Sequence, residues 1–396
     1  MEIKQIYSLV NDAIKESTGQ SDLLKDDLSN LVDVGASVLT SDKNVDSYAK
    51  ALINCIGKMV FVARPYGGYA PSVMMDSWEY GSIVEKVKFI APEAEKNDSW
   101  DLTDGTSYDQ DIFKKPQVTI KLFNKKTTFE VPLSITDIQI KQSFHNASEM
   151  NSFISMLYVG MDNSMTEAMD ELVIRAIDNM IGETIKDEYY DTSKKAMTDL
   201  GAKSGIRAVN LLKLYNSNFN KSLKASDALG DVDFLRYSGM VIRNYTKRLE
   251  KMSTLFNVGK QKKFTYKDLL HVIMLSDFVS ATSTYLESST FNKELVALPK
   301  FEEVGYWQGT GTDYSKNSQL HIVTAKDQTE INVTGKILGV MFDRDALGVS
   351  NWNRRTTTHR NEKAEFTNMW YKMDVGFYND LDENFVVFFI QDAVGA

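Results

Sequence analysis

One amphipathic helical pattern runs from about Asn146 to Ile185 without a proline. At about 1.5 Å per residue it predicts a helix roughly 60 Å long, with a soft spot near Gly160 and Asp162. A compact chain of this size has a radius of gyration of about 21 Å, so such a helix favours a flat, extended protomer, and flat protomers usually tile. A buried helix in an ordinary enzyme is the alternative. The apolar residues recur every three or four positions and so share one face: Met150, Phe153, Ile154, Leu157, Tyr158, Met161, Met165, Met169, Leu172, Val173, Ile177, Met180 and Ile181.

Composition limits the class of protein. With 396 residues, of which 43% are hydrophobic and 25% charged, the chain can bury a large core divided into two or more lobes. Its net charge of −9 argues against phosphate binding as the main task, because affinity for nucleic acid rests largely on clustered Lys and Arg.

Neither secretion nor a membrane partner is expected. The first residues, Met1–Gln5, lack the basic region and apolar core of a signal peptide, and the apolar run Phe385–Ile390 is too short to span a bilayer. Cys55 is the only cysteine, so neither an internal disulfide nor a cysteine-based zinc site can form, which suits a reducing compartment.

The first part of the chain reads as an arm followed by a hairpin. Residues 1–75 contain short helical patterns and polar breaks that cannot form a core alone. The runs Ile83–Ala91 and Val118–Leu122 alternate apolar and polar residues, which predicts the two arms of a β-hairpin. Between them Pro92–Phe113 forms a long acidic tip, and loops of this length are commonly functional or mobile.

A second hairpin is predicted to turn through Asn124–Lys126. Its outgoing strand would place Phe129, Val131, Leu133 and Ile135 on one face. Pro132 inside this run indicates an edge strand or a bulge, because proline cannot donate a ladder hydrogen bond.

The remainder mixes helices and strands. Helical patterns cover Ala208–Leu223 and about Val232–Met252, and an apolar run follows at Leu269–Leu275. Strands are predicted at Asn332–Val340, Phe366–Gly376 and Phe385–Ile390. Strands before the long helix are expected to pair with strands after the middle region, which would make the middle region an insertion.

The sequence gives little support for catalysis. His145, His271, His321 and His359 stand alone, without a second ligand at metal-binding spacing. Asp343 and Asp345 could be read as a paired-carboxylate site, and they are the basis of the alternative that the chain is a soluble α/β enzyme. We expect no metal and no cofactor.

Charge is distributed unevenly between two segments. The tip is acidic, whereas Arg344, Arg354, Arg355, Arg360 and Lys363 cluster in a segment rich in Asn and Thr that reads as a loop. Two independently solvated loops are the alternative to a contact between them.

Two blocks resemble one protein family. The first looks like the middle domain of the major capsid proteins of tailed bacteriophages, and the second resembles the closing strands of the same proteins. The first block comprises Asp268–Phe278, Thr290–Val296, Leu298–Pro299 and Gly305–Gly309; the second comprises Leu338–Val349, Lys372–Leu381 and Glu383–Val387.

The resemblance implies an α+β fold of the Hong Kong 97 type. It would comprise an N-terminal arm at residues 1–75, an extended hairpin loop at 76–114, a peripheral domain with the long spine helix at 115–200, and an inserted axial domain at 201–330. The strands of 331–396 would complete the peripheral domain.

The resemblance also implies a structural, non-enzymatic role. Pentamers and hexamers of the chain would close into an icosahedral phage head around double-stranded DNA, without sequence-specific binding. A portal protein and a separate scaffolding protein are the expected partners. Some members of the family carry their scaffold as an N-terminal extension of about a hundred residues, whereas only about 75 residues precede the hairpin here. The protein would assemble in the host cytoplasm and reside in the virion; an encapsulin-like protein compartment is the alternative.

Within such a shell, the uneven charges predict a contact between subunits. The acidic tip of one subunit would lie against the arginines of a neighbour, because a projecting hairpin needs a complementary surface. The residues of this predicted contact are Asp98, Asp101, Asp104, Asp109 and Asp111 on the tip, and Arg354, Arg355 and Arg360 on the neighbour.

Overall fold

The computed structural model describes residues 64–65, 68, 74–75, 84–90, 92–108, 111, 113–124, 126–136, 147–287, 299–307, 320–323 and 329–394. The chain divides into two units. The first comprises Met1–Arg64 and Asn146–Leu157, and the second comprises Pro65–His145 and Tyr158–Ala396. Almost all of the predicted arm at residues 1–75 lies outside the described residues, so the account below concerns mainly the second unit.

The long helix is confirmed as α5, Ala147–Tyr189. Its 43 residues correspond to about 64 Å, and its helical hydrogen bonding continues unbroken past Gly160. The apolar face predicted from the spacing is buried over most of its described length, whereas Tyr158 at its start is 47% exposed. The buried residues of this face are Met161, Met165, Leu172, Val173, Ile177, Met180 and Ile181.

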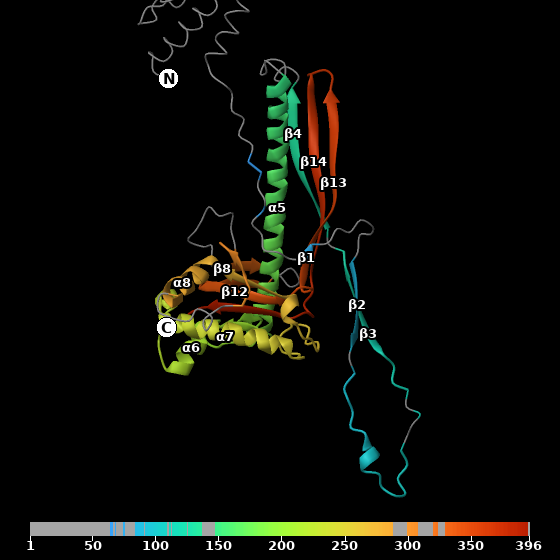
Figure 1. Ribbon diagram of the computed structural model, residues 1–396, viewed down its shortest axis with the longest axis vertical. Helices are drawn as coiled ribbons and strands as arrows, with labels where there is room; N and C mark the ends of the chain where they lie inside the picture. Colours follow the sequence, from blue (N-terminus) through green and yellow to red (C-terminus); the bar gives the residue numbers. More distant parts are fainter. Residues whose placement is uncertain are drawn as a thin grey trace, which may run out of the picture. The chain divides into compact units, whose positions relative to one another are not determined.

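A four-stranded sheet accompanies α5 and has the order β1-β13-β14-β4 (Figure 1). Its strands are β1 (Met74–Met75), β4 (Lys126–Thr136), β13 (Leu347–Asn361) and β14 (Phe366–Asn379). β4 and β14 are antiparallel, with Val131 opposite Tyr371. Strands on either side of the middle region therefore pair, as predicted, and Pro132 lies on an edge strand.

The second predicted hairpin is wrong. β4 pairs with β14 and not with the strand that precedes it. The alternating apolar side chains of β4 explain the choice: Phe129 and Val131 pack against the core that α5 covers, which includes Val173 and Met373.

A five-stranded sheet has the order β7-β15-β12-β8-β9. Its strands are β7 (Ala208–Asn210), β8 (Leu270–Leu275), β9 (Glu302–Val304), β12 (Lys336–Asp343) and β15 (Phe385–Ile390). Side chains of α5 pack on one face, while those of α6 (Leu211–Phe219), α7 (Val232–Glu250) and α8 (Ser276–Glu287) pack on the other (Figure 1). Every residue of β15 is buried, as its continuous apolar run indicates.

Close backbone approach shapes this sheet at two glycines. A Cβ on Gly339 would lie 2.8 Å from the Ile273 carbonyl oxygen of the neighbouring strand. A Cβ on Gly335 would lie 1.8 Å from the Ile390 carbonyl oxygen, so glycine is required there too. Gly335 separates β12 from β11 (Glu330–Val333), and the single strand predicted at Asn332–Val340 is therefore two strands. β11 pairs with β10 (Leu320–Val323).

Two further predictions require correction. The helix predicted from Ala208 starts only at Leu211, because Ala208–Asn210 pairs with β15 and the Asn210 side chain caps the helix by accepting from the Lys213 amide. The Arg-rich segment predicted as a loop is most of strand β13. Many of its side chains, including Thr356–Arg360, are exposed, so the segment has no apolar alternation by which to recognise a strand.

The strands after residue 331 are shared between the two sheets. β13 and β14 belong with β4, whereas β12 and β15 belong with β7, β8 and β9. The turn from Asp380 to Asn384 therefore connects one sheet to the other, since β14 ends at Asn379 and β15 begins at Phe385.

The first predicted hairpin is confirmed. β2 (Val84–Ile90) pairs in antiparallel fashion with β3 (Gln117–Phe123), and the two form a sheet of their own. Within the described residues of the tip between them lies one 3₁₀ turn, η1 (Asp98–Trp100).

Candidate functional site at the base of the hairpin

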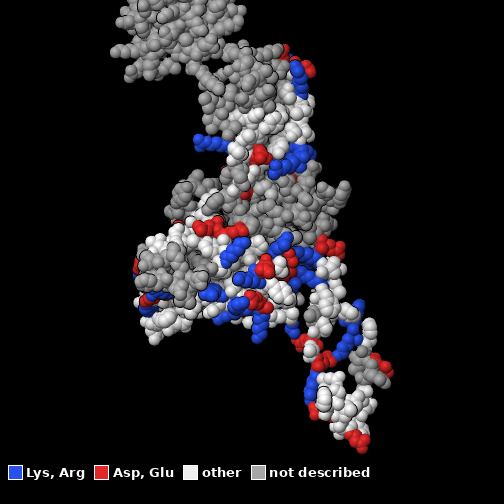
Figure 2. All heavy atoms as spheres, in the orientation of Figure 1, with Lys and Arg blue, Asp and Glu red and all other residues white. Residues whose placement is uncertain are grey.

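The acidic tip is exposed along its described length. Asp98, Asp101, Asp104 and Asp111 are all exposed, and Asp109 lies outside the described residues. Within the tip, Lys96 Nζ is 2.9 Å from Asp101 Oδ2. Large apolar side chains accompany the carboxylates, since Trp100 is 94% exposed and Phe113 is 85% exposed. In Figure 2 the lower end of the hairpin correspondingly shows white spheres beside red ones.

The three predicted arginines lie on β13, and each has a carboxylate partner in its own chain. Arg354 Nη1 is 3.1 Å from Asp162 Oδ1 on α5. Arg355 donates to both carboxylate oxygens of Asp374 on β14, with Nη2 at 3.1 Å from Oδ1. Arg360 Nε is 3.5 Å from Glu362 Oε1. The ion-pair partners of Arg354 and Arg355 therefore lie on α5 and β14 and not among the described residues of the tip.

The hairpin has one polar and one apolar face. Because directly opposed residues share a face, Val87 and Ile120 lie together, as do Phe89 and Val118. These four side chains and Leu122 are each between 53% and 62% exposed. Lys86 and Lys121 oppose each other on the other face, and Lys88 lies beside them.

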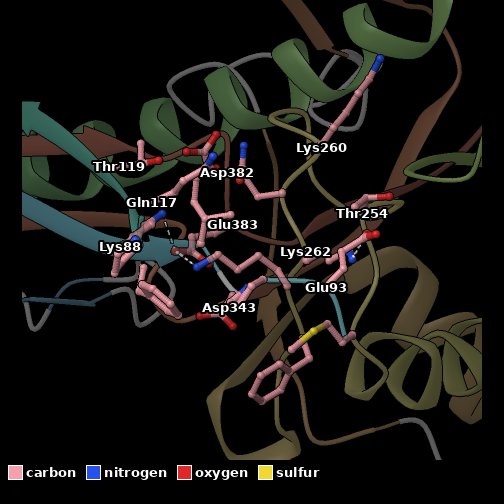
Figure 3. A pocket seen from close by; sticks show the side chains of 18 of the residues that line it. Lys88, Glu93, Gln117, Thr119, Thr254, Lys260, Lys262, Asp343, Asp382 and Glu383 are labelled. Atoms are coloured by element: carbon pink, nitrogen blue, oxygen red, sulfur yellow. Dashed lines mark hydrogen bonds and ion pairs between the residues drawn. The ribbon is translucent and has the colours of Figure 1, made fainter. Parts of the chain in front are cut away.

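The polar face contacts the turn between β14 and β15. Lys88 Nζ is 2.5 Å from Asp380 Oδ2 and 2.7 Å from Glu383 Oε1. Lys121 Nζ is 3.1 Å from Asp380 Oδ1 and 2.5 Å from Asp382 Oδ2. Lys86 Nζ is 3.5 Å from Asp380 Oδ2. We call these three lysines and three carboxylates the hairpin anchor; Figure 3 shows Lys88, Asp382 and Glu383 grouped in this region.

The anchor is largely shielded from water. The Asp380 side chain has no exposed surface, and those of Lys86 and Lys88 are each 16% exposed. Burial alone would raise the pKa of the Asp380 carboxyl, but the hydrogen bond from Lys88 and the nearby ammonium charges outweigh burial and hold the pKa at about 2. Asp380 is therefore ionised over the physiological pH range.

The lysines respond differently to the same surroundings. Burial lowers the pKa of the Lys88 ammonium, but its hydrogen bonds to Asp380 and Glu383 outweigh that effect, so the pKa is raised. For Lys86 burial prevails over the attraction of Asp380, and its pKa is lowered. Lys86 also lies over the Tyr378 ring, 4.6 Å from its centroid.

A buried polar network continues beneath the anchor. Thr265 Oγ1 donates to Asp343 Oδ2 at 2.6 Å and accepts from Asn384 Nδ2 at 3.1 Å. The Asp345 amide donates to Asp343 Oδ1 at 3.0 Å. Burial raises the pKa of the Asp343 carboxyl despite these hydrogen bonds. Both carboxylate oxygens of Asp343 thus accept hydrogen bonds from within the fold.

A groove of about 1130 Å³ runs beside the anchor, between the hairpin and the segment 252–269. Glu93 lies on one side of it and is paired with Lys262 at 2.5 Å, as Figure 3 shows. Among the described residues no group of His, Cys, Asp or Glu is arranged to hold a metal ion. The described helices also include none that is long and apolar enough to cross a bilayer.

Sequence reasoning missed the anchor. The pattern of β2 placed Lys86 and Lys88 on one face, but it could not show what that face meets. The acidic sequence of the turn, Asp380-Leu381-Asp382-Glu383, was the complementary feature. The two segments are more than 250 positions apart, so only the tertiary fold brings them together.

A family model described as Phi29-like phage major capsid protein matches residues 8–389. No curated protein sequence matches the chain.

Solved structures of phage capsids are similar at low sequence identity. The capsid structure of Staphylococcus phage Andhra is 7% identical with a TM-score of 0.49, covering 85% of this chain and 87% of that one. The capsid structure of Cyanophage P-SCSP1u is 9% identical with a TM-score of 0.44, covering 86% and 95%. The mature capsid of bacteriophage PhiM1 is 8% identical with a TM-score of 0.41, covering 84% and 92%.

Proposed function

Since the chain belongs to the family of Phi29-like phage major capsid proteins, we propose that its copies form pentamers and hexamers that close into an icosahedral head enclosing double-stranded DNA. Its role is structural, it associates with itself, and it resides in the virion. Family membership favours this role over an encapsulin-like compartment and over a soluble enzyme. We assign no catalytic step to any residue.

The finer organisation follows the Hong Kong 97 type. An arm at residues 1–75 and an extended hairpin loop at 76–114 precede a peripheral domain at 115–200, and an axial domain occupies 201–330. The pairing of β4 with β14 supports a peripheral domain completed by strands of 331–396. β12 and β15 lie in the sheet of the axial segment, so the two domains share the C-terminal strands.

The partners follow from the same role. A separate scaffolding protein guides assembly in the host cytoplasm, and a portal protein occupies one vertex. Packaged DNA meets the inner face without sequence-specific contacts, which accords with the net charge of −9.

The observation that best supports self-association is the apolar face of the hairpin. Its five exposed side chains, Val87, Phe89, Val118, Ile120 and Leu122, form one continuous row on a two-stranded ribbon. Soluble monomers rarely leave such a row in water, and large exposed apolar patches usually mark protein interfaces. In the shell this row is buried against another subunit.

Polar substitution of this row tests the proposal. Phe89→Ser combined with Ile120→Ser should leave the subunit folded, because both side chains are already 57% or more exposed, while shells and rings are lost in electron micrographs. Met240→Ser is the matched control, since Met240 is 52% exposed and belongs to α7 and not to the hairpin. Normal assembly of the double variant would contradict the proposal.

The charged contact between subunits remains part of this proposal. Asp98, Asp101, Asp104, Asp109 and Asp111 of one tip lie against Arg354, Arg355 and Arg360 of a neighbour. Two features support it: the described tip carboxylates are exposed, and all three arginines lie on one strand, β13, with Arg354 and Arg360 on the same face of it. A guanidinium has five N–H donors in a fixed fork, so an arginine that already donates to one carboxylate can donate to a second.

A further inference from the structure

Among the described residues, the hairpin has few supports within its own subunit. β2 and β3 pair only with each other among the described strands, and a two-stranded hairpin is marginally stable on its own. One face is exposed, as described above. At the base, the Phe123 ring lies 5.2 Å from the Tyr378 ring, and towards the tip Glu93 pairs with Lys262. Between these points, the anchor lysines are the described contacts of the polar face.

The anchor meets the subunit at a particular place. Asp380, Asp382 and Glu383 all lie in the turn that connects the four-stranded to the five-stranded sheet. The turn is fixed by its own backbone, since the Asp380 amide donates to the Ala346 carbonyl at 2.7 Å and the Gly259 amide donates to the Leu381 carbonyl at 2.8 Å. The connection between β12 and β13 and the segment between α7 and β8 therefore hold the turn in position.

We propose that the hairpin anchor is an electrostatic latch that sets the orientation of the hairpin relative to the junction of the two sheets. Lys88 and Lys121 come from different strands of the hairpin, and each contacts two carboxylates of the turn. The contacts therefore restrain rotation of the hairpin as well as its distance from the turn. Lys86 adds a third ammonium group against the buried Asp380.

Physical reasons favour a latch over a merely solvated charge cluster. Exposed ion pairs contribute little because water and salt screen them. Here Asp380 is fully buried, so removing its partners leaves an uncompensated charge away from water, which is strongly unfavourable. The hairpin can therefore leave this position only if the turn and the lysines are rehydrated together.

The latch predicts a change in orientation without loss of the fold. β3 ends at Phe123 and β4 begins at Lys126, so the chain enters the four-stranded sheet directly after the hairpin. Releasing the lysines should let the hairpin swing about that connection while β4 stays paired with β14.

Distance measurements between two spin labels test the latch directly. Labels at Val118→Cys on the exposed face of β3 and at Ser217→Cys on α6, in a Cys55→Ser background, report the orientation of the hairpin strands. Lys88→Met with Lys121→Met should broaden the distance distribution and shift its maximum. The matched control is Lys96→Met with Lys114→Met, which removes two hairpin lysines whose partners, Asp101 and Glu95, are exposed.

A charge swap covers the case in which the double variant fails to fold. Lys121→Asp alone should broaden the distribution of distances between the labels. Adding Asp382→Lys should restore the narrow distribution of the wild type, because Lys121 Nζ and Asp382 Oδ2 lie 2.5 Å apart. Lys88→Arg should leave the distance distribution narrow, because arginine keeps the positive charge at this position. An unchanged distribution in the latch variants, equal broadening in the control, or no rescue by the swap would overturn the proposal.

The labelled subunit is measured before assembly, so the result does not depend on shell formation. If neither wild type nor variants assemble, the capsid role fails and the latch is still decided by the distances. If wild type forms regular shells, the released hairpin should give particles of mixed diameter, because the angle between neighbours is no longer fixed.

Discussion

Ile177 has no exposed surface and lies within the main core, between α5 and the strands that it covers. Ile177→Asp would bury a charge without a partner, at a cost of several kcal/mol against a total stability of about 5 to 15 kcal/mol. We expect the variant to be insoluble or unfolded. Met169→Asp should be milder, since Met169 is only partly buried against the same core.

Soluble yield and thermal unfolding by circular dichroism measure these effects. Glu171→Gln is the control, because Glu171 is exposed on the same helix. Wild-type yield of folded, assembly-competent Ile177→Asp would show that the buried face of α5 is misassigned.

The lowered pKa of the Asp380 carboxyl should make the stability of the fold depend on pH. Its carboxyl has a pKa of about 2 in the folded chain against a usual 3.8, so its contribution is complete above the usual value and is lost as the pH falls towards 2. The shift corresponds to about 2 kcal/mol. Denaturant unfolding at a series of acidic pH values should show this loss in the wild type and not in Asp380→Asn. Equal pH dependence in the two proteins would contradict the assignment.

The charged contact between subunits is tested by reversing charge. Arg354→Glu with Arg355→Glu should leave the subunit folded while impairing closure of the shell, and tip Asp→Lys changes should partly rescue it. Each exposed pair contributes only about 0 to 1 kcal/mol, but a shell repeats the contact at every subunit. Arg360→Glu alone leaves the ion pair between Arg355 and Asp374 intact, so impaired closure in this variant would come from the contact between subunits.

Normal closure of the double variant at low and at physiological salt would contradict the charged contact. A shell structure that places the tip and β13 of adjoining subunits far apart would do the same. The capsid assignment would stand in either case.

At the scale of elements, the helix and strands that have a regular spacing of apolar residues could be predicted from the sequence. The spacing of Met161, Met165 and Leu172 gave α5, and the alternation in β2 and β3 gave the hairpin. β13 was missed because Thr and Arg side chains project to solvent over much of its length, which leaves no apolar alternation. Partners far apart in sequence, such as β4 with β14 or Lys88 with Asp380, depend on tertiary packing that a local pattern does not contain.

The hairpin tip predicts a difference between free and assembled subunits. The segment Pro92–Phe113 is exposed where described and buries little apolar surface, so its amides should exchange rapidly in the free subunit. In the shell, contact with a neighbour should protect them. Hydrogen exchange of β15 amides is the internal control, since this strand is buried in either state. Equal protection of the tip in both states would contradict a role in assembly.

At the scale of the whole molecule, the central claim is that this chain is built to bind copies of itself. Family membership supports the claim over residues 8–389, and the exposed apolar face of the hairpin supplies a physical reason for it. Electron microscopy of the purified protein, alone and with a separately expressed scaffolding protein, tests it most directly. The account predicts shells, tubes or rings of subunits, whereas a discrete monomer at high protein concentration, with and without scaffold, would contradict it.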